Sequence, residues 1–426
     1  MLTARFIREN AARVRRDLAR RHVDAPLEQL LQVDEQHRAL LAEVESLRAE
    51  RNAASKAIGQ TKDPAERGRR IAAARELSDR LTDREARLRE LENALQQLLY
   101  EIPNIIDDDV PDGADESANV VVETVGEPPT FDFQPLPHWD LGERLGGIDL
   151  ERGAKMAGSR FFVLRGQVAR LHRALTQWML DLHVDEGGFT EHYLPYMMSE
   201  ASFWASGHLP KFRENLYFDG EEDYFFIPTA EAPFANLYRD EILPAGSLPM
   251  RFVAHTPCFR REKMSAGRDT RGLKRVHQFE KVEMFIFCEA EQSDSELNLL
   301  VRRAKSIPER LGLAHRVVQL CSGDLDFKAS KGFDVEIWSP GIGEWLEVSS
   351  CSNVRDFQAV RANIRYRPEE GSGTRYPHML NGSGLAPGRT LIAVLENYQQ
   401  RDGSVVIPDV LRCYMGGAER IEPPPA

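Results

Sequence analysis

Two long stretches with a coiled-coil rhythm constrain the fold of this chain more than any other feature. In residues 30–58, apolar or heptad-phase residues recur at alternating steps of three and four, and the same rhythm returns in residues 74–98. The stretch between them runs from Gly59 to Pro64 and predicts a short turn. Two helices joined by a short turn lie antiparallel. The sequence therefore predicts an N-terminal two-helix arm within residues 1–105, on the order of 45 Å long.

Positive charge is concentrated around the predicted turn, although the whole chain has a formal net charge of −12. Two arginines, Arg51 and Arg84, occupy positions of the apolar seam. We therefore expect less apolar burial in the distal part of the arm than at its base. Periodicity alone leaves a dimerisation coiled coil open, but the local charge favours an arm that touches an anionic partner. Its predicted contacts are Arg48, Arg51, Lys56, Lys62, Arg67, Arg69 and Arg70.

Composition excludes several classes of protein. No apolar run approaches the roughly 20 residues that a membrane span needs, and the N-terminus has no apolar signal core. The five cysteines are scattered and odd in number, which argues against a disulfide framework and against a zinc ribbon. We therefore predict a cytoplasmic protein with reduced thiols, no membrane association and no zinc.

After a proline- and aspartate-rich segment the character of the chain changes. Residues 106–137 are predicted to be a linker, and residues 138–426 a second domain. Several predicted strands follow one another without an intervening helix, so the fold class is α+β with a mainly antiparallel sheet flanked by helices. The predicted strands are residues 224–227, 252–256, 282–287, 333–338 and 345–349, and the predicted helices include residues 168–185 and 296–311.

The nucleotide-binding motifs of other folds are missing. The run Lys263-Met264-Ser265 is similar to a known nucleotide-binding signature, but the His-Ile-Gly-His motif that accompanies that signature is absent from this chain. The glycines around Gly384 do not have the spacing of a Rossmann loop. Residues 259–283 offer another solution, because Arg260 and Glu262 are predicted to share one face of a strand. An arginine there can fork onto a phosphate, and a glutamate can accept from an amine. A basic hairpin without a ligand would show the same composition.

The segment FRREKMSAGRDTRGLKRVHQFEKVE resembles motif 2 of the class II aminoacyl-tRNA synthetases in its seryl form. The resemblance implies that Arg260 contacts the α-phosphate and the serine carboxylate. It also implies that Glu262 meets the adenine amino group, that Phe279 stacks on adenine, and that Glu283 faces the substrate serine. Arg261 and Val276 complete the ATP contacts that this segment is expected to make.

Three further segments agree with the seryl-tRNA synthetase family, in its bacterial form. Residues 227–231 are similar to its serine-binding element, residues 347–353 to its ATP and magnesium segment, and residues 381–390 to its motif 3. Residues 168–195 resemble motif 1, which implies a homodimer. By this resemblance the serine contacts include Thr229, Ala230, Glu231, Asn381 and Ser383. The ATP contacts include Glu347, Val348, Ser349, Ser350 and Arg389, with Glu347 and Ser350 as ligands of Mg²⁺.

The resemblance implies a two-step reaction without a protein nucleophile. Serine is activated with ATP and then transferred to the 3′ end of tRNA(Ser), which the arm recognises by its long variable arm while the catalytic domain binds the acceptor end. Charging of tRNA(Sec) is a further possibility that the sequence leaves open. Arg260, Arg389 and Glu347 are the residues expected to carry catalysis, by positioning and by charge stabilisation.

Some residues depart from the family pattern. Lys263 and Met264 in the motif 2 loop and Met379 before motif 3 replace the usual residues. Such changes suit a duplicated synthetase for antibiotic self-resistance or a specialised pathway as well as a housekeeping enzyme. A catalytically silent tRNA-binding paralogue would also keep the arm, but it disagrees with the presence of Arg260 and Arg389. An amino-acid:carrier-protein ligase would share the catalytic core, but it disagrees with the presence of the arm.

Overall fold

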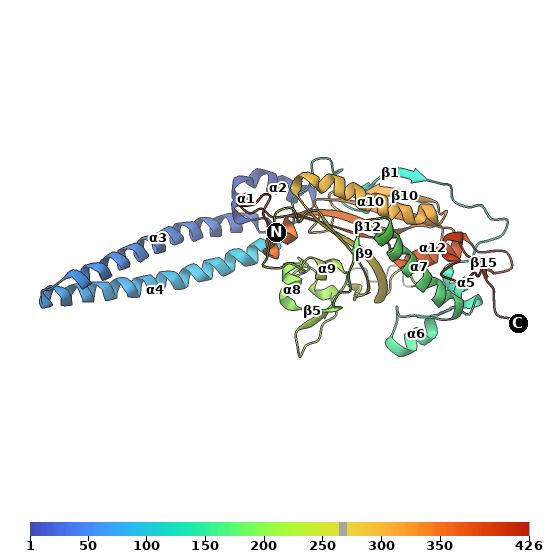
Figure 1. The fold of residues 1–426 in the computed structure, drawn as a ribbon, viewed down its shortest axis with the longest axis horizontal. Helices are drawn as coiled ribbons and strands as arrows, with labels where there is room; N and C mark the ends of the chain where they lie inside the picture. The colour runs from blue at the N-terminus through green and yellow to red at the C-terminus, as the bar shows by residue number, and fades with distance from the viewer. Residues whose placement is uncertain (264–270, 426) are drawn as a thin grey trace. The chain divides into compact units, whose positions relative to one another are not determined.

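The computed structural model describes residues 1–263 and 271–425 (Figure 1). The chain divides into two compact units. One unit is helical and comprises Leu2–Ala19 and Val23–Pro103, and the other comprises Met1, Arg20–His22 and Asn104–Ala426. Each unit has its own architecture.

The helical unit is dominated by two long helices that run side by side (Figure 1). Short helices α1 (Ala4–Glu9) and α2 (Ala11–Arg20) precede α3 (Leu27–Gln60) and α4 (Pro64–Glu101). The turn is short because α4 begins at once: Pro64 takes the first helical position, where no N–H donor is needed, and the Asp63 side chain accepts from the backbone N–H of Glu66. The predicted antiparallel arm is confirmed.

Apolar packing in the arm is confined to the part that lies away from the turn between α3 and α4, which we call its base. A cluster of buried leucines and a valine joins the two helices there, whereas residues 48–80 contain no buried side chain. The seam arginines are exposed, and Arg84 forms an ion pair with Glu43 at 3.0 Å. A second pair, Arg48 with Glu85, joins the helices at 2.8 Å. The buried cluster consists of Leu40, Val44, Leu47, Leu81, Leu88 and Leu91.

The second unit is built on a sheet of eight strands among the described residues. The spatial order is β1-β10-β11-β12-β14-β9-β8-β4, and the neighbours are antiparallel except for β4 and β8. The predicted α+β fold with a mainly antiparallel sheet is confirmed. The bounds are β1 (Val120–Val125), β10 (His315–Gln319), β11 (Lys331–Ser339), β12 (Glu344–Arg355), β14 (His378–Ser383), β9 (Gln278–Cys288), β8 (Met250–Phe259) and β4 (Thr190–Glu191).

Side-chain alternation along β9 separates two cores. Val282, Met284 and Ile286 face a large core that is covered by α7 (Gly166–Asp185), α10 (Ser293–Arg310) and α12 (Pro387–Asn397). Phe285 and Phe287 face a second core, which includes residues of α9 (Glu231–Phe234) and α11 (Phe357–Arg361). On this second face the strand turns polar towards its start, and a cavity begins there.

Strand β1 lies within residues 106–137, where the composition predicted only a linker. It pairs with β10 at the edge of the sheet, and its valines Val120, Val121 and Val122 are exposed. An edge strand needs neither a continuous apolar face nor a second partner, which explains why the proline- and aspartate-rich context concealed it.

Smaller elements complete the second unit. They are α5 (His138–Arg144), β2 (Ile148–Asp149), α6 (Leu150–Ala157), β3 (Val163–Leu164), β5 (Met197–Ser199), α8 (Glu200–Ala205), β6 (Tyr224–Phe226), β7 (Ile242–Leu243), β13 (Arg365–Tyr366), β15 (Val405–Val406) and β16 (Arg420–Ile421). Among the described residues, no helix is both long enough and apolar enough to cross a membrane.

The burial pattern of the arm makes its base the stabilising part. Leu88→Ala removes a buried side chain and should cost about 3 kcal/mol of local stability, which corresponds to roughly a hundredfold faster amide exchange in the basal turns of α3 and α4. Peptide-resolved hydrogen exchange on the full chain measures this directly. Ile71→Ala is the matched control, because Ile71 is 50% exposed and lies in the same helix. Equal acceleration by both variants would contradict a basal core.

Candidate active site

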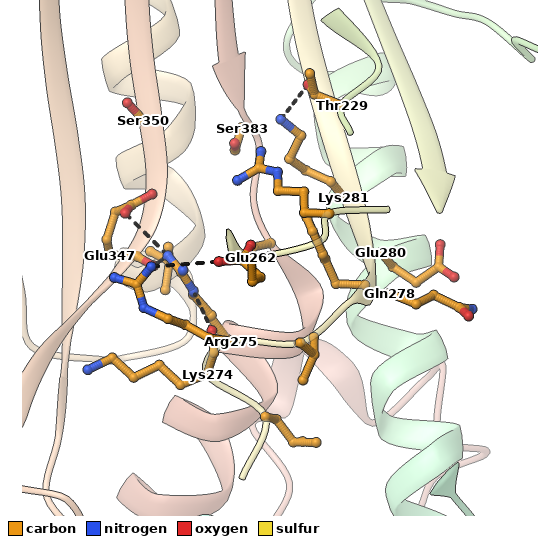
Figure 2. Close-up of a pocket in the computed structure, with 18 of the residues that line it drawn as sticks. Thr229, Glu262, Lys274, Arg275, Gln278, Glu280, Lys281, Glu347, Ser350 and Ser383 are labelled. Atoms are coloured by element: carbon orange, nitrogen blue, oxygen red, sulfur yellow. Dashed lines mark hydrogen bonds and ion pairs between the residues drawn. The ribbon is translucent and has the colours of Figure 1, made fainter. Parts of the chain in front are cut away.

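A cavity of about 700 Å³ opens where the polar halves of the central strands meet. It gathers most of the residues that the sequence singled out in the second unit. Figure 2 shows Glu347 on the left of the lining side chains and Thr229 at the upper right. The predicted residues that line it are Thr229, Glu231, Arg260, Glu262, Val276, Phe279, Glu347, Val348, Ser350, Asn381, Ser383 and Arg389. Ala230, Arg261, Glu283 and Ser349 are not part of the lining surface.

Arg260 and Glu262 reach the cavity by a route that the sequence did not predict. Strand β8 ends at Phe259, so the prediction that both residues share one face of a strand is wrong. The backbone N–H of Arg260 still bonds to the carbonyl of His277 at 2.9 Å, and Glu262 has a positive φ of 50°. The chain is already turning into the loop at this point, and the turn brings both side chains to the cavity. Arg261 donates its backbone N–H to the backbone carbonyl of Asn215 at 2.9 Å but is not itself a lining residue.

One end of the cavity presents an aromatic ring beside positive charge. The guanidinium of Arg260 lies 5.1 Å from the centre of the Phe279 ring, a cation–π distance. Arg275 lies 3.8 Å from the carboxylate of Glu262. A planar base with attached phosphates requires this combination of a flat apolar surface and fixed cations.

A bulge in β12 decides which of its side chains face the cavity. The register with β11 pairs Ser349 with Val335 but Glu347 with Glu336, so Val348 has no partner of its own. Strict alternation would place Glu347 and Ser350 on opposite faces, since they are three residues apart. The extra residue brings both to the same cavity. No feature of the sequence marks this bulge.

Glu347 is held by cations at the cavity wall. Arg389 contacts its carboxylate at 3.3 Å and donates to its backbone carbonyl at 2.7 Å. Desolvation raises the pKa of Glu347, but Arg389 and Arg260 outweigh it and leave the pKa below its usual value. The side chain is nevertheless 46% exposed, because it faces the open cavity. An ionised, accessible carboxylate is a suitable ligand for a hard cation.

Glu347 and Ser350 both line the cavity, but no group of three or more His, Cys, Asp or Glu side chains in the described part of the chain is placed to hold a metal ion by itself. Asp334 is the cross-strand partner of Ser350, and its Oδ1 atom is buried without a hydrogen-bond partner among the described residues. Burial and the nearby charge of Glu347 raise the pKa of Asp334 well above its usual value. A divalent cation would relieve both the missing partner and the repulsion between the carboxylates.

Two carboxylates and two ammonium groups are buried at the other end of the cavity. Lys281 donates to the Thr229 hydroxyl at 2.6 Å (Figure 2) and lies 2.5 Å from Glu283. Lys328 lies 2.8 Å from Glu231. The Asn381 amide lies between the two carboxylates, 3.4 Å from Glu231 and 3.3 Å from Glu283.

Glu283 is fully buried, one layer below the lining residues. Burial raises its pKa, and the neighbouring Lys281 opposes that shift. Glu283 is the cross-strand partner of Ser383, which does line the cavity. Ser349 is also buried and donates its hydroxyl to the backbone carbonyl of Ser383 at 2.5 Å. Ala230 is buried at the N-cap of α9 and exposes no side chain to the cavity.

The sequence analysis missed several charged residues of the cavity. Lys281 precedes Glu283 by two residues on β9, so strand alternation was a sufficient signal for it. Lys328 and Asp326 come from a loop that no motif marks. Asn104 holds this loop in place, because its side chain donates to the carbonyls of Lys328 and Val354 at 2.8 and 2.9 Å. The other missed lining residues include Lys274, Arg275, Gln278 and Glu280.

The residues that depart from the family pattern have different surroundings. Met379 is buried in the second core and Leu380 in the large core, and Asn381 lines the cavity. Lys263 is exposed, and its backbone N–H donates to Asn215 at 3.2 Å. Met264 lies outside the described residues.

The predicted anionic-partner contacts lie around the turn between α3 and α4, and all seven are exposed. Three of them form ion pairs: Arg48 with Glu85, and both Arg69 and Arg70 with Glu66. Among the described residues, no ion pair involves Arg51, Lys56, Lys62 or Arg67. The surface around the turn therefore carries uncompensated positive charge.

Known proteins match both units of the chain. Residues 1–106 match the Seryl-tRNA synthetase N-terminal domain, and residues 212–398 match the tRNA synthetase class II core domain (G, H, P, S and T). The serine–tRNA ligase of Thermomicrobium roseum is 58% identical over 426 residues, which are 100% of this chain and 96% of that protein. The serine–tRNA ligase of Chloroflexus aurantiacus is 54% identical over 424 residues, 99% of this chain and 100% of that protein.

The fold is also that of a solved seryl-tRNA synthetase. The crystal structure of the enzyme from Pyrococcus horikoshii, complexed with ATP, superposes with a TM-score of 0.93 at 36% identity and covers 100% of both chains. The identities, the two matched domains and the geometry of the cavity agree with the expectation from the motifs. The chain belongs to the seryl-tRNA synthetase family of class II aminoacyl-tRNA synthetases.

Proposed function

We propose that this chain activates L-serine with ATP and transfers the seryl group to the 3′ end of tRNA(Ser). The observation that carries the proposal is the single cavity with two chemically distinct ends. One end combines Phe279 with Arg260 and Arg389, and the other combines Thr229, Glu231 and Asn381, with Glu283 in the layer below. The first suits a nucleoside triphosphate, and the second suits a small zwitterion with a hydroxyl group. Serine-dependent ATP–pyrophosphate exchange, followed by charging of added tRNA, tests it.

In the proposed reaction the serine carboxylate attacks the α-phosphate of ATP, and pyrophosphate leaves. Arg260 would hold the carboxylate and the α-phosphate together, and Arg389 would stabilise charge on the γ-phosphate. The 3′-terminal adenosine hydroxyl of tRNA then attacks the carbonyl carbon of seryl-adenylate and releases AMP. Mg²⁺, held by Glu347 and Ser350, would neutralise charge on the phosphates. Ser349 serves structure, since its hydroxyl is already committed to the Ser383 carbonyl.

Selectivity for serine must come from its hydroxyl group, since the side chain is otherwise tiny. We propose that Thr229, Glu231 and Asn381 receive the ammonium group and that Glu283 and Ser383 recognise the hydroxyl. Alanine would leave these buried polar groups without a partner, and the extra methyl group of threonine would not fit.

The arm is proposed to bind tRNA(Ser) through its long variable arm. Exposed cations around the turn can contact the RNA backbone without reading bases, which suits recognition by shape.

We further propose a homodimer through residues 168–195, a cytoplasmic location, and domain limits at residues 105 and 137. Charging of tRNA(Sec) is a second candidate reaction. A silent paralogue, a duplicated resistance enzyme and a carrier-protein ligase are not favoured, because serine–tRNA ligases match the whole chain, arm included.

Substitutions at the serine end test the pocket. Ser383→Ala and Glu283→Gln should each raise the KM for serine about ten- to a hundredfold, because each removes one partner of a buried hydrogen-bonding group. The KM for ATP should stay within about twofold, since the other end is untouched. Both constants come from pyrophosphate exchange, and thermal unfolding controls for folding. An unchanged serine requirement would remove both residues from the pocket.

The magnesium ligands are tested by metal dependence. Glu347→Gln should raise the Mg²⁺ concentration for half-maximal exchange by about tenfold, because an amide binds a hard cation more weakly than a carboxylate does. Glu344→Gln is the matched control on the same strand, where Glu344 pairs with Lys274 at 2.6 Å. An equal shift in both variants would show a general charge effect in place of a ligand.

Charge substitutions on the arm test the RNA contact. Replacing Arg51, Lys56, Lys62 and Arg67 by glutamine should raise the Kd for tRNA(Ser) at least about tenfold and make its salt dependence shallower, because fewer phosphates are neutralised. Serine activation without tRNA should not change. A variant with Arg15, Arg38, Arg84 and Arg87 replaced by glutamine removes the same number of charges and is the control, since each of these cations is already paired with a carboxylate. A larger effect of the control would place the contact nearer the base.

A further inference from the structure

Lys328 is a buried cation at the serine end of the cavity that none of the recognised motifs contains. It is 4% exposed, comes from the loop between β10 and β11, and lines the cavity. Its ammonium group lies 2.8 Å from Oε1 of Glu231, and that oxygen also accepts from Gln358 at 2.6 Å. Burial lowers the pKa of Lys328, but Asp326 and Glu231 outweigh it and raise the pKa above its usual value. The side chain is therefore charged at neutral pH.

The surroundings hold this ammonium group in one place. The Nζ atom lies 3.5 Å from Nε2 of the buried His208, whose Nδ1 is within 2.8 Å of the Ser206 hydroxyl. Burial and the charge of Lys328 keep the pKa of His208 well below its usual value, so the imidazole is neutral and can accept from the ammonium group. The Phe212 ring centre lies 5.8 Å away on another side. A solvated surface lysine would have none of these constraints.

Lys328 completes a balance of charge at this end of the cavity. Glu231 and Glu283 are 5% and 0% exposed, and each lies beside one lysine, Lys328 and Lys281 respectively. These four buried residues together carry no net charge, and the further carboxylate near Lys328, Asp326 at 3.9 Å, is exposed and screened by solvent. Buried carboxylates without such partners would take up protons or attract cations.

We propose that Lys328 is a specificity-determining residue, which fixes Glu231 and keeps the pocket neutral so that it accepts a zwitterion with an α-carboxylate in preference to a simple amine. This inference rests on the proposed serine site. Because the ammonium group holds Oε1 of Glu231, Oε2 is the oxygen that faces Asn381, at 3.4 Å. A ligand with both charges leaves the pocket neutral, whereas an amine without a carboxylate adds an uncompensated positive charge.

The test compares serine with serinol, which has an ammonium group and hydroxyl groups but no carboxylate. Pyrophosphate exchange on the full chain gives the KM for serine and the inhibition constant of serinol. Lys328→Met should lower the ratio of the serinol constant to the serine KM at least about tenfold, because a nearby positive charge that favours carboxylates has been removed. Lys328→Gln should lower this ratio as well. Its amide can still donate to Glu231, so it replaces the methionine variant if that variant does not fold. The KM for ATP should stay within about twofold.

Charge balance is separated from a structural role by two further variants. Lys328→Arg keeps the charge and should retain most of the native ratio. The double variant Glu231→Gln with Lys328→Met removes one charge of each sign, and its ratio should return to within about threefold of the native value. A ratio that stays native in both Lys328→Met and Lys328→Gln overturns the inference. A native serine KM in Glu283→Gln would instead show that the serine site itself is misassigned.

Discussion

Strand β9 is bonded along both of its edges, to β8 on one side and to β14 on the other, and the remaining geometry of the site depends on that pairing. The register places Ser383 opposite Glu283 and the end of β8 opposite the start of β9. Phe285 and Phe287 lock one face of the strand into the second core. Glu283 and Lys281 continue the same face by alternation, so the apolar packing that fixes the aromatic residues also aims Lys281 at the cavity and places Glu283 just below its surface.

Fixed charges of opposite sign recur at both ends of the cavity. Arg389 holds Glu347 at one end, and Lys328 holds Glu231 at the other. Activation of an amino acid moves negative charge between a carboxylate, phosphates and a leaving group, with little covalent chemistry for the protein to perform. Groups already oriented by their partners stabilise that charge without reorganising during the reaction. These ion pairs are thus better understood as devices that orient the side chains than as sources of stability.

The arm differs from the cavity, because most of its charged side chains are exposed. The arm concentrates its apolar contacts at the base, with two cross-helix ion pairs beside them, and leaves its distal turns to exposed cations. Such a surface gains little from its own packing and presents charge that an RNA backbone can use. In the second unit, by contrast, Asn104 stabilises the site although it lies next to the predicted linker. Its side chain donates hydrogen bonds both to the loop that carries Lys328 and to β12.

The sequence by itself determined the arm, the mainly antiparallel sheet and twelve of the thirty described residues that line the cavity, because heptad spacing, strand alternation and the family motifs are local patterns. Tertiary structure decided what depends on pairing between distant segments. The bulge at Val348 turns Glu347 and Ser350 to one side, which strict alternation does not allow, and β8 ends before Arg260, which the sequence analysis had placed on the strand. It also decided that Lys328 meets Glu231, since electrostatic pairing of buried side chains depends on distance in space and leaves no periodic trace along the chain.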